Sequence, residues 1–222
     1  MNKKLVVILD FQLGNLFSVK QACDKVGLHA MISSQKEDIN KSDGVILPGV
    51  GAFAEAMANL HNLDLVEPLK DFVSAGKPLF GVCLGQQLLF TESEEFGTSK
   101  GLDFIPGVIK KFPTFKGSNN LIKVPQIGWN HIYKKSNPWE DTPLAGVKEN
   151  AYVYFVHSYY VEPRDQQNIL TLTNYAGIEY CSAVTKNPNI FATQFHPEKS
   201  GELGIGIYKR WGKLYNLIPN ES

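Results

Sequence analysis

Short runs of uninterrupted apolar residues in the first half of the chain constrain its fold most strongly. Residues 5–9, 44–47 and 79–82 consist only of apolar side chains and glycine, and residues 29–32 form a further candidate strand. A strand that is apolar at every position has to be covered on both faces, which is typical of parallel sheets. We therefore expect buried strands at these segments.

Segments with helical spacing of apolar residues alternate with these runs. In residues 14–26 apolar side chains recur at helical intervals, and Gly27 follows as a helix stop. A second such segment covers residues 65–73 and ends before Gly76, and a third covers residues 84–90. The alternation predicts an α/β fold, with an open, mostly parallel sheet flanked by helices on both faces.

The second half of the chain has a different pattern. Several short segments indicate strands separated by turn-rich sequence, and a last helix is expected at residues 204–217. The strand segments are residues 108–112, 122–124, 152–156, 169–173, 180–184 and 190–195. We interpret residues 1–222 as a single α/β domain with an added antiparallel portion.

Composition and charge exclude several classes of protein. The chain carries 22 basic and 22 acidic side chains, so we expect neither a nucleic-acid footprint nor a polybasic membrane surface. The apolar run before Asp10 is too short for a signal peptide, and no stretch approaches the roughly 20 apolar residues of a membrane span. Three cysteines without close pairs favour a reducing cytoplasm. No cluster has zinc-ligand spacing, so neither a metal nor a cofactor is expected.

The most informative motif is Gly81-Val82-Cys83-Leu84-Gly85, between a predicted strand and a predicted helix. This is a nucleophile elbow with cysteine as the nucleophile. Its glycines allow a close approach of backbone segments, and the helix N-terminus after Cys83 favours a thiolate. We predict Cys83 as a catalytic nucleophile. Cys23 on an apolar helix face and Cys181 in a strand without flanking glycines are interpreted as buried structural residues.

His196 and Glu198 supply the base and the orienting group that a thiol nucleophile needs. Pro197 biases His196 toward an extended conformation, and residues two apart in an extended segment point the same way. Glu198 can then hold one ring nitrogen while the other faces Cys83. On its own, a His-x-Glu motif indicates a strand-end histidine and a solvated glutamate; together with the cysteine elbow it indicates a catalytic triad.

The elbow and the His196-Pro197-Glu198 motif together resemble the class I (triad) glutamine amidotransferases. Members of this family hydrolyse glutamine through a glutamyl thioester and pass the ammonia to a synthase. Residues 14–16, 48–53, 155–160 and 196–201 are similar to the histidine-pathway branch of the family. The resemblance extends from about residue 5 to residue 215, which is nearly the whole chain.

The resemblance implies roles for individual residues. Cys83 would be the nucleophile, His196 the base and Glu198 its orienting group. The backbone amides of Leu84 and Val50 would form the oxyanion hole, and the glycines beside Val50 permit a peptide flip that turns its amide inward. The residues implied to bind the substrate glutamine are Gly49, Gly51, Gln87, Glu95, Ser158 and Tyr159.

The resemblance also implies a heterodimer with a (β/α)8-barrel cyclase that makes imidazole glycerol phosphate in histidine biosynthesis. A barrel alone needs roughly 250 residues, so the synthase has to be a separate chain. The implied docking face includes Gln126, Trp129, Asn130, Tyr154 and Lys199.

Three departures from the branch pattern leave the partner open. Gln126 stands where the branch usually has histidine, Phe11 where it has tyrosine, and residues 113–121 form a small insertion. Paralogous subunits serve sugar amidation in surface-polysaccharide pathways, and they remain an alternative. A non-catalytic subunit is disfavoured by the intact triad. A cysteine peptidase is disfavoured by Gln87 and by residues 48–51.

For two of the implied site residues there is also a purely structural interpretation. For Trp129 the alternative is a position in the hydrophobic core. For Glu95 it is a solvated place in the acidic run of residues 92–95.

Overall fold

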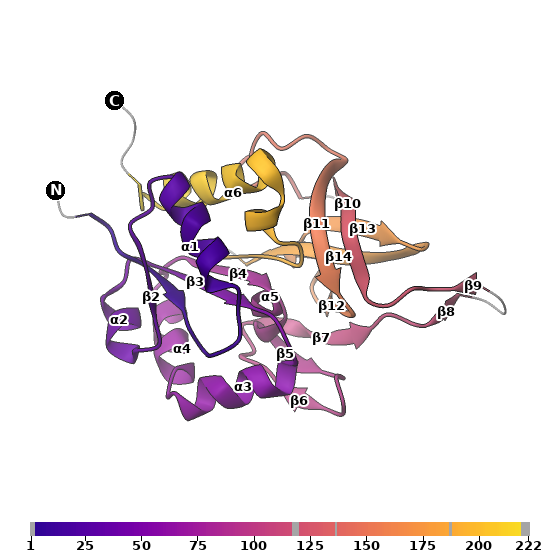
Figure 1. Ribbon diagram of the computed structural model, residues 1–222, viewed down its shortest axis with the longest axis horizontal. Coiled ribbons are helices and arrows are strands. Elements are labelled where there is room, and N and C mark those ends of the chain that lie inside the picture. Colours follow the sequence, from indigo (N-terminus) through magenta and orange to yellow (C-terminus); the bar gives the residue numbers. More distant parts are fainter. Residues whose placement is uncertain (1–2, 117–119, 136, 187, 219–222) are drawn as a thin grey trace.

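The computed structural model describes residues 3–116, 120–135, 137–186 and 188–218. One side of its main sheet consists of parallel strands in the order β2-β1-β3-β4-β15. Of these, β2, β3 and β4 are labelled in Figure 1. The parallel strands are β1 (Val6–Leu9), β2 (Ala30–Ser33), β3 (Gly44–Gly49), β4 (Leu79–Cys83) and β15 (Ile190–Thr193). Apart from the edge strand β2, their residues are all buried, as the apolar runs require. The predicted parallel sheet is confirmed.

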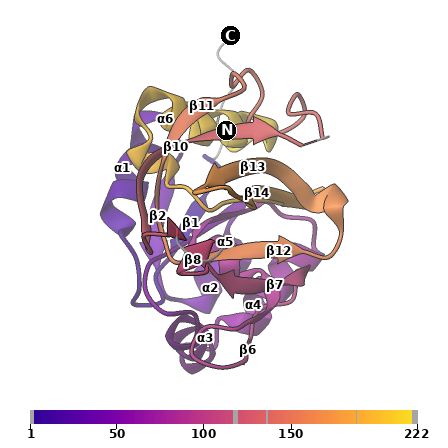
Figure 2. The same cartoon turned by 90° about the vertical axis from the view of Figure 1, so that its right-hand side faces the viewer.

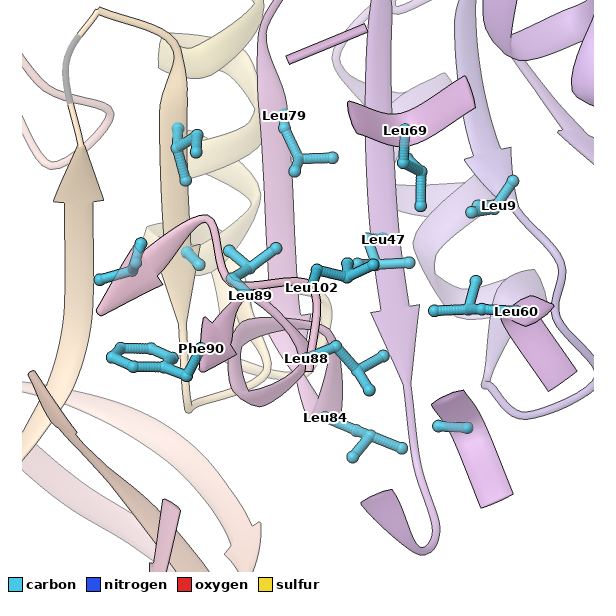
Figure 3. Close-up of a cluster of buried hydrophobic side chains, with 14 of the residues drawn as sticks. Leu9, Leu47, Leu60, Leu69, Leu79, Leu84, Leu88, Leu89, Phe90 and Leu102 are labelled. Atoms are coloured by element: carbon cyan, nitrogen blue, oxygen red, sulfur yellow. The ribbon is translucent and has the colours of Figure 1, made fainter. Parts of the chain in front are cut away.

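Helices cover both faces of these strands (Figure 1). On one face lie α1 (Leu16–Lys25) and α6 (Gly201–Leu214), and on the other α2 (Lys36–Lys41), α3 (Phe53–Asn62) and α4 (Val66–Ser74). Alternate residues of β1 point into two separate cores. Leu9 packs in the cluster drawn in Figure 3, which includes Leu60 of α3 and Leu69 of α4, and Ile8 packs with α1 and α6.

The other side of the sheet is mainly antiparallel, although β5 and β7 pair in parallel, and β14 (Ile178–Lys186) joins the two sides. It pairs with β15, β12 and β13. Figure 2 shows β14 between β13 and β12. β7 runs along β12 and β5, β6 pairs with β5, and β10 lies between β11 and β13. These strands are β5 (Phe90–Ser93), β6 (Ser99–Lys100), β7 (Ile105–Lys111), β10 (Gln126–Lys134), β11 (Ala151–His157), β12 (Tyr159–Pro163) and β13 (Ile169–Tyr175). The added antiparallel portion is therefore confirmed.

The strand predicted at residues 122–124 is wrong. The described part of the insertion at residues 113–121 forms a separate hairpin of β8 (Phe115–Lys116) and β9 (Asn120–Leu121), and residues 117–119 lie outside the described residues. Ile122 is buried, and its amide donates to the carbonyl of Thr114 across the base of this hairpin. The segment therefore closes a hairpin and joins no strand of the main sheet.

The helix predicted at residues 84–90 is shorter than expected. α5 covers Leu84–Leu88, and β5 begins two residues later. The carbonyls of Leu88 and Leu89 accept hydrogen bonds of 2.9 Å from the amides of Leu102 and Ile105. These carbonyls are therefore unavailable for further helical turns, and the chain enters the sheet.

Other boundaries also differ from the prediction. α6 begins at Gly201 and ends at Leu214, three residues before the predicted limits. α2, α3 and β10 were not predicted. In α2 and β10 the apolar residues are too sparse or too irregularly spaced to reveal a period. In α3 the buried residues Phe53, Ala56, Met57 and Leu60 do recur at helical intervals, so this helix was overlooked although its pattern is present in the sequence. Within the described residues, no helix is both long and apolar enough to cross a membrane.

Candidate active site

Cys83 lies in a strained turn between β4 and α5. Its backbone has φ +56° and ψ −110°, a conformation that side chains other than glycine rarely adopt. The turn packs closely on β3, since a Cβ added at Gly85 would lie 1.7 Å from the carbonyl oxygen of Leu47. The glycine of the elbow motif is therefore needed for contact with the neighbouring strand.

His196 and Glu198 form a buried pair just after β15. Nδ1 of His196 lies 2.7 Å from Oε1 of Glu198, and both side chains are almost fully enclosed. The expected extended segment is wrong beyond His196, because Pro197–Lys199 forms a 3₁₀ turn. This turn still brings Glu198 back to the ring. The hydroxyl of Tyr208 on α6 donates to Oε2 of Glu198 at 3.4 Å.

The charges around His196 favour its protonated form. Burial lowers the pKa of this histidine, but its interactions with the neighbouring Cys83 side chain and with Glu198 outweigh that effect and raise the pKa to about 10. Its second ring nitrogen, Nε2, is buried and has no hydrogen-bond partner within the part of the chain that the structure describes. A thiolate–imidazolium pair is the charge state that this arrangement stabilises.

A cavity of about 430 Å³ opens in front of the Cys83 sulfur. Its walls contain most of the residues that the sequence implied for substrate and oxyanion binding. These are Val50, Gly51, Leu84, Gln87, Glu95, Ser158 and Tyr159. Gly49 lies behind the wall: it is buried, and a Cβ there would come within 3.1 Å of the Leu84 side chain.

Glu95 and Lys111 place opposite charges on the cavity wall. Oε2 of Glu95 accepts a 2.6 Å hydrogen bond from the amide of Phe53, so this half-buried carboxylate is anchored to the start of α3 and is not simply solvated. Lys111 ends β7, and its Nζ lies 6.0 Å from the centre of the Tyr159 ring. Lys111 was not predicted as a site residue, because only the pairing of β7 with β12 reveals its place beside Tyr159.

Gln87 uses both hydrogens of its side-chain amide inside the protein. Nε2 donates to the carbonyl of Tyr159 at 3.0 Å and to Oε1 of Gln194 at 2.9 Å. Gln194 in turn places its Nε2 3.7 Å from the Cys83 sulfur. Gln87 therefore has only Oε1 left for a ligand in the cavity.

The implied docking residues lie on β10, β11 and the 3₁₀ turn. Trp129 is 55% exposed, so its core reading is wrong. It is paired with Tyr154 across β10 and β11, and Nζ of Lys199 lies 6.0 Å from the Tyr154 ring. Nδ2 of Asn130 donates to the carbonyl of Asn174. The prediction that Gln126 belongs to the docking face is wrong. Its side chain is only 2% exposed and lies next to the Tyr180 hydroxyl, so it does not face a partner.

The two other cysteines are structural. Cys23 and Cys181 are buried in the core, and burial raises the pKa of both thiols far above the ordinary value. The described residues contain no group of three His, Cys, Asp or Glu side chains placed to hold a metal ion.

A thiol held in a strained turn beside a buried histidine–glutamate pair, on an α/β sheet, defines the class of cysteine-dependent acyl-transfer enzymes. The chain belongs to the class-I glutamine amidotransferase family, whose model matches residues 7–206.

Relatives and solved structures agree with this assignment. The chain is 41% identical to "Imidazole glycerol phosphate synthase subunit HisH" of Geobacter sulfurreducens, over 94% of this chain and 98% of that protein. It is 42% identical to the protein of the same name from Geobacter metallireducens, over 93% and 96%. A structure described as PurLQS from Thermotoga maritima shares the fold, with TM-score 0.72, 15% identity and coverage of 96% and 99%.

Proposed function

We propose that this chain hydrolyses glutamine at Cys83 and delivers the ammonia to a partner that makes imidazole glycerol phosphate. The observation that carries the proposal is the buried pair of His196 and Glu198, joined at 2.7 Å next to the elbow thiol. The names of the relatives, more than 40% identical over nearly their whole length, support the histidine pathway as the destination of the ammonia.

The first half of the reaction forms a thioester. The Cys83 thiolate attacks the side-chain carbonyl carbon of glutamine, and the His196 imidazolium gives its proton to the leaving nitrogen, so ammonia departs. In the second half, neutral His196 takes a proton from water as the water attacks the thioester. The thiolate leaves, glutamate forms and the imidazolium is restored. Glu198 holds the ring and stabilises its positive charge in both halves.

Backbone amides would stabilise the negative oxygen of each tetrahedral intermediate. The amide of Leu84 follows the nucleophile at the start of α5, where helix N–H groups are free. Gly49 is paired with Cys83 across β3 and β4, and Val50 follows directly, which supports a role for the Val50 amide at the same site. Gly51 has φ +112°, a conformation that permits reorientation of this segment.

The charged groups of the cavity suit the two ends of a free amino acid. The Glu95 carboxylate and the free Oε1 of Gln87 are acceptors for an α-ammonium group. Lys111 supplies a positive charge for an α-carboxylate, and Ser158 a hydroxyl beside it. We assign these residues, together with Tyr159, to substrate binding.

We further propose that residues 1–222 act as one glutaminase domain in the cytoplasm and dock a (β/α)8-barrel cyclase. The free thiols of all three cysteines support a reducing compartment. The exposed side chains of Trp129, Ile127 and Tyr152 support docking along β10 and β11.

A second candidate function keeps the same glutaminase chemistry but delivers the ammonia to a synthase that amidates sugars. The observation in its favour is the hairpin of β8 and β9, which extends away from the sheet close to β10 (Figure 1). Such an added element alters the surface that a partner meets. It leaves the triad unchanged.

The test is to measure glutamate formation by the purified chain alone, with a histidine-pathway cyclase and with a sugar-pathway synthase. We expect little turnover alone and a rise of about 10²–10³ with the cyclase, the size of effect that one oxyanion donor has in a protease. Full activity of the isolated chain would contradict the idea of a reorienting oxyanion segment. Activation by the sugar-pathway synthase alone would establish the second candidate, and no glutamate under any condition would refute the glutaminase.

A further inference from the structure

A line of buried polar side chains reaches the active site from the first residue of β10. Gln126 of β10, Tyr180 of β14 and His157 of β11 are 2%, 2% and 6% exposed. Oε1 of Gln126 lies 2.9 Å from the Tyr180 hydroxyl, which lies 3.1 Å from Nε2 of His157. None of these side chains takes part in the reaction steps above, so their burial needs another explanation.

The acceptors around His157 determine which of its two ring nitrogens carries the proton. Nδ1 of His157 lies 2.8 Å from the Tyr159 carbonyl, which only accepts, so Nδ1 carries the proton. Burial, with the nearby charge of His196 adding to it, lowers the pKa of His157 to about 4, so the ring is neutral at pH 7 and Nε2 is an acceptor.

The single hydroxyl proton of Tyr180 then goes to His157. Because this proton is used, Tyr180 cannot also donate to Oε1 of Gln126, and its oxygen can only accept a hydrogen bond from that side chain. A rotation of the Gln126 amide by half a turn supplies the donor from Nε2, which otherwise has no partner among the described residues.

The Tyr159 carbonyl connects this line to the nucleophile. It accepts from Nδ1 of His157 and, at 3.0 Å, from Nε2 of Gln87. Gln87 also donates to Gln194, whose own amide lies 3.7 Å from the Cys83 sulfur. A continuous chain of hydrogen bonds therefore runs from the start of β10 to the reactive thiol.

We propose that Tyr180, held between Gln126 and His157, is a positioning residue that fixes the Tyr159 carbonyl and, through Gln87 and Gln194, the surroundings of the Cys83 sulfur. This inference rests on the proposed glutaminase. Trp129 lies three residues after Gln126 on the same strand. The series of hydrogen bonds therefore also links the proposed docking strand to the nucleophile.

The variant that tests this role is Tyr180→Phe, which keeps the ring packing against Phe112 and removes only the hydroxyl. In the complex with the activating partner we expect kcat/KM for glutamine to fall about tenfold to 100-fold, because small displacements of reacting groups have effects of that size. The rate of Cys83 alkylation by iodoacetamide should also fall severalfold, since a loosened Gln194 amide stabilises the thiolate less.

Two comparisons separate positioning from general damage. Tyr215→Phe removes another tyrosine hydroxyl, which donates to the carbonyl of Pro188 and does not line the cavity, and should leave both rates unchanged. Gln126→His keeps a ring nitrogen for the Tyr180 hydroxyl and should retain most of the activity, whereas Gln126→Leu should behave like Tyr180→Phe. A thermal unfolding curve of every variant gives the fraction of folded protein at the assay temperature, and each rate is divided by this fraction.

Several results would overturn the inference. One is a Tyr180→Phe protein that is less stable but has wild-type kcat, KM and alkylation rate per folded molecule. Equal loss in Gln126→His and Gln126→Leu is another. If Tyr180→Phe does not fold, the Gln126 pair decides by the same measurements. If the wild type forms no glutamate, the glutaminase proposal fails, while alkylation still tests whether the chain positions Cys83.

Discussion

The parallel and antiparallel sides of the sheet hold the active site in different ways. On the parallel side, the backbone of β3 and β4 positions Cys83, and a missing Cβ at Gly85 makes the close contact possible. On the antiparallel side, side chains far apart in sequence, such as Gln126 and Tyr180, are hydrogen-bonded behind His157, which lines the cavity. The nucleophile is thus set by local backbone geometry, and its surroundings are set by long-range pairing.

This difference explains which parts of the site are readable in a sequence. Glycines flanking a cysteine after an apolar run indicate a turn directly, because few other residues tolerate that geometry. Tyr180 and His157 are separated by 23 positions and meet only because β10 to β14 pair in one particular register. No local pattern reveals that register.

The largest expected effect concerns the parallel side. Cys83→Ala should abolish glutamine hydrolysis, with a loss of about 10⁶ in kcat, the cost of removing a nucleophile from a protease triad. The partner should still bind and should still use free ammonia supplied at high pH. Glutamate formation in the purified complex is the measurement.

A matched control is Cys181→Ala, which removes a buried thiol on the antiparallel side. Its sulfur donates to the Ala183 carbonyl and lies outside the cavity, so turnover per folded molecule should stay close to wild type. Near-normal glutaminase activity of Cys83→Ala would remove Cys83 from the mechanism.

The second effect concerns the junction of the two sides, where His196 and Glu198 follow β15. His196→Ala should cost about 10⁶ in kcat and Glu198→Gln about 10⁴ or less, because the amide keeps part of the geometry without the charge. Steady-state kinetics of both variants in the complex give the ratio. Greater damage from Glu198→Gln than from His196→Ala would contradict the assigned roles.

The features that could be predicted from the sequence are the local ones, and the features that could not be predicted depend on long-range strand pairing. The buried strands β1, β3 and β4 were located from apolar runs, and Cys83, His196 and Glu198 from short motifs. By contrast, β10 mixes exposed and half-buried residues and has no clear alternation, so it was not expected as a strand.

The surface position of Gln126 was predicted wrongly for a related reason. Gln126 was placed on the docking face because it belongs to the same segment as Trp129, yet tertiary pairing buries it against Tyr180. Sequence pattern reveals periodicity and special backbone positions. It does not reveal which polar side chains find a buried partner.

The third effect tests the buried histidine of the antiparallel side by pH. The folded protein holds His157 neutral down to a pKa of about 4, mainly because the ring is buried, whereas the unfolded chain takes up this proton near the ordinary value of 6.5. Between these values the unfolded state binds more protons, so the free energy of unfolding should fall as the pH is lowered. His157 should contribute about 3 kcal/mol to this fall.

Denaturant unfolding at several pH values between 7 and 4 measures this contribution. In His157→Asn the stability at pH 7 should be lower, but the part of the pH dependence due to this side chain should disappear. Identical pH dependence of unfolding in wild type and variant would show that His157 does not stay neutral in the folded protein.

The smallest effect concerns the outer surface of the antiparallel side. Trp129 is 55% exposed on β10, and its ring lies against Tyr154 with centroids 6.2 Å apart. Exposed tryptophans that anchor an interface typically contribute about 2 kcal/mol or more, so Trp129→Ala should weaken cyclase binding roughly 30-fold without changing stability. Leu214→Ala, an exposed apolar residue at the end of α6, is the matched control and should bind normally. Titration calorimetry with the cyclase gives both dissociation constants. Unchanged affinity of Trp129→Ala would move the docking surface away from β10, and the hydrogen-bonded chain from Gln126 to Cys83 would then have no partner to connect.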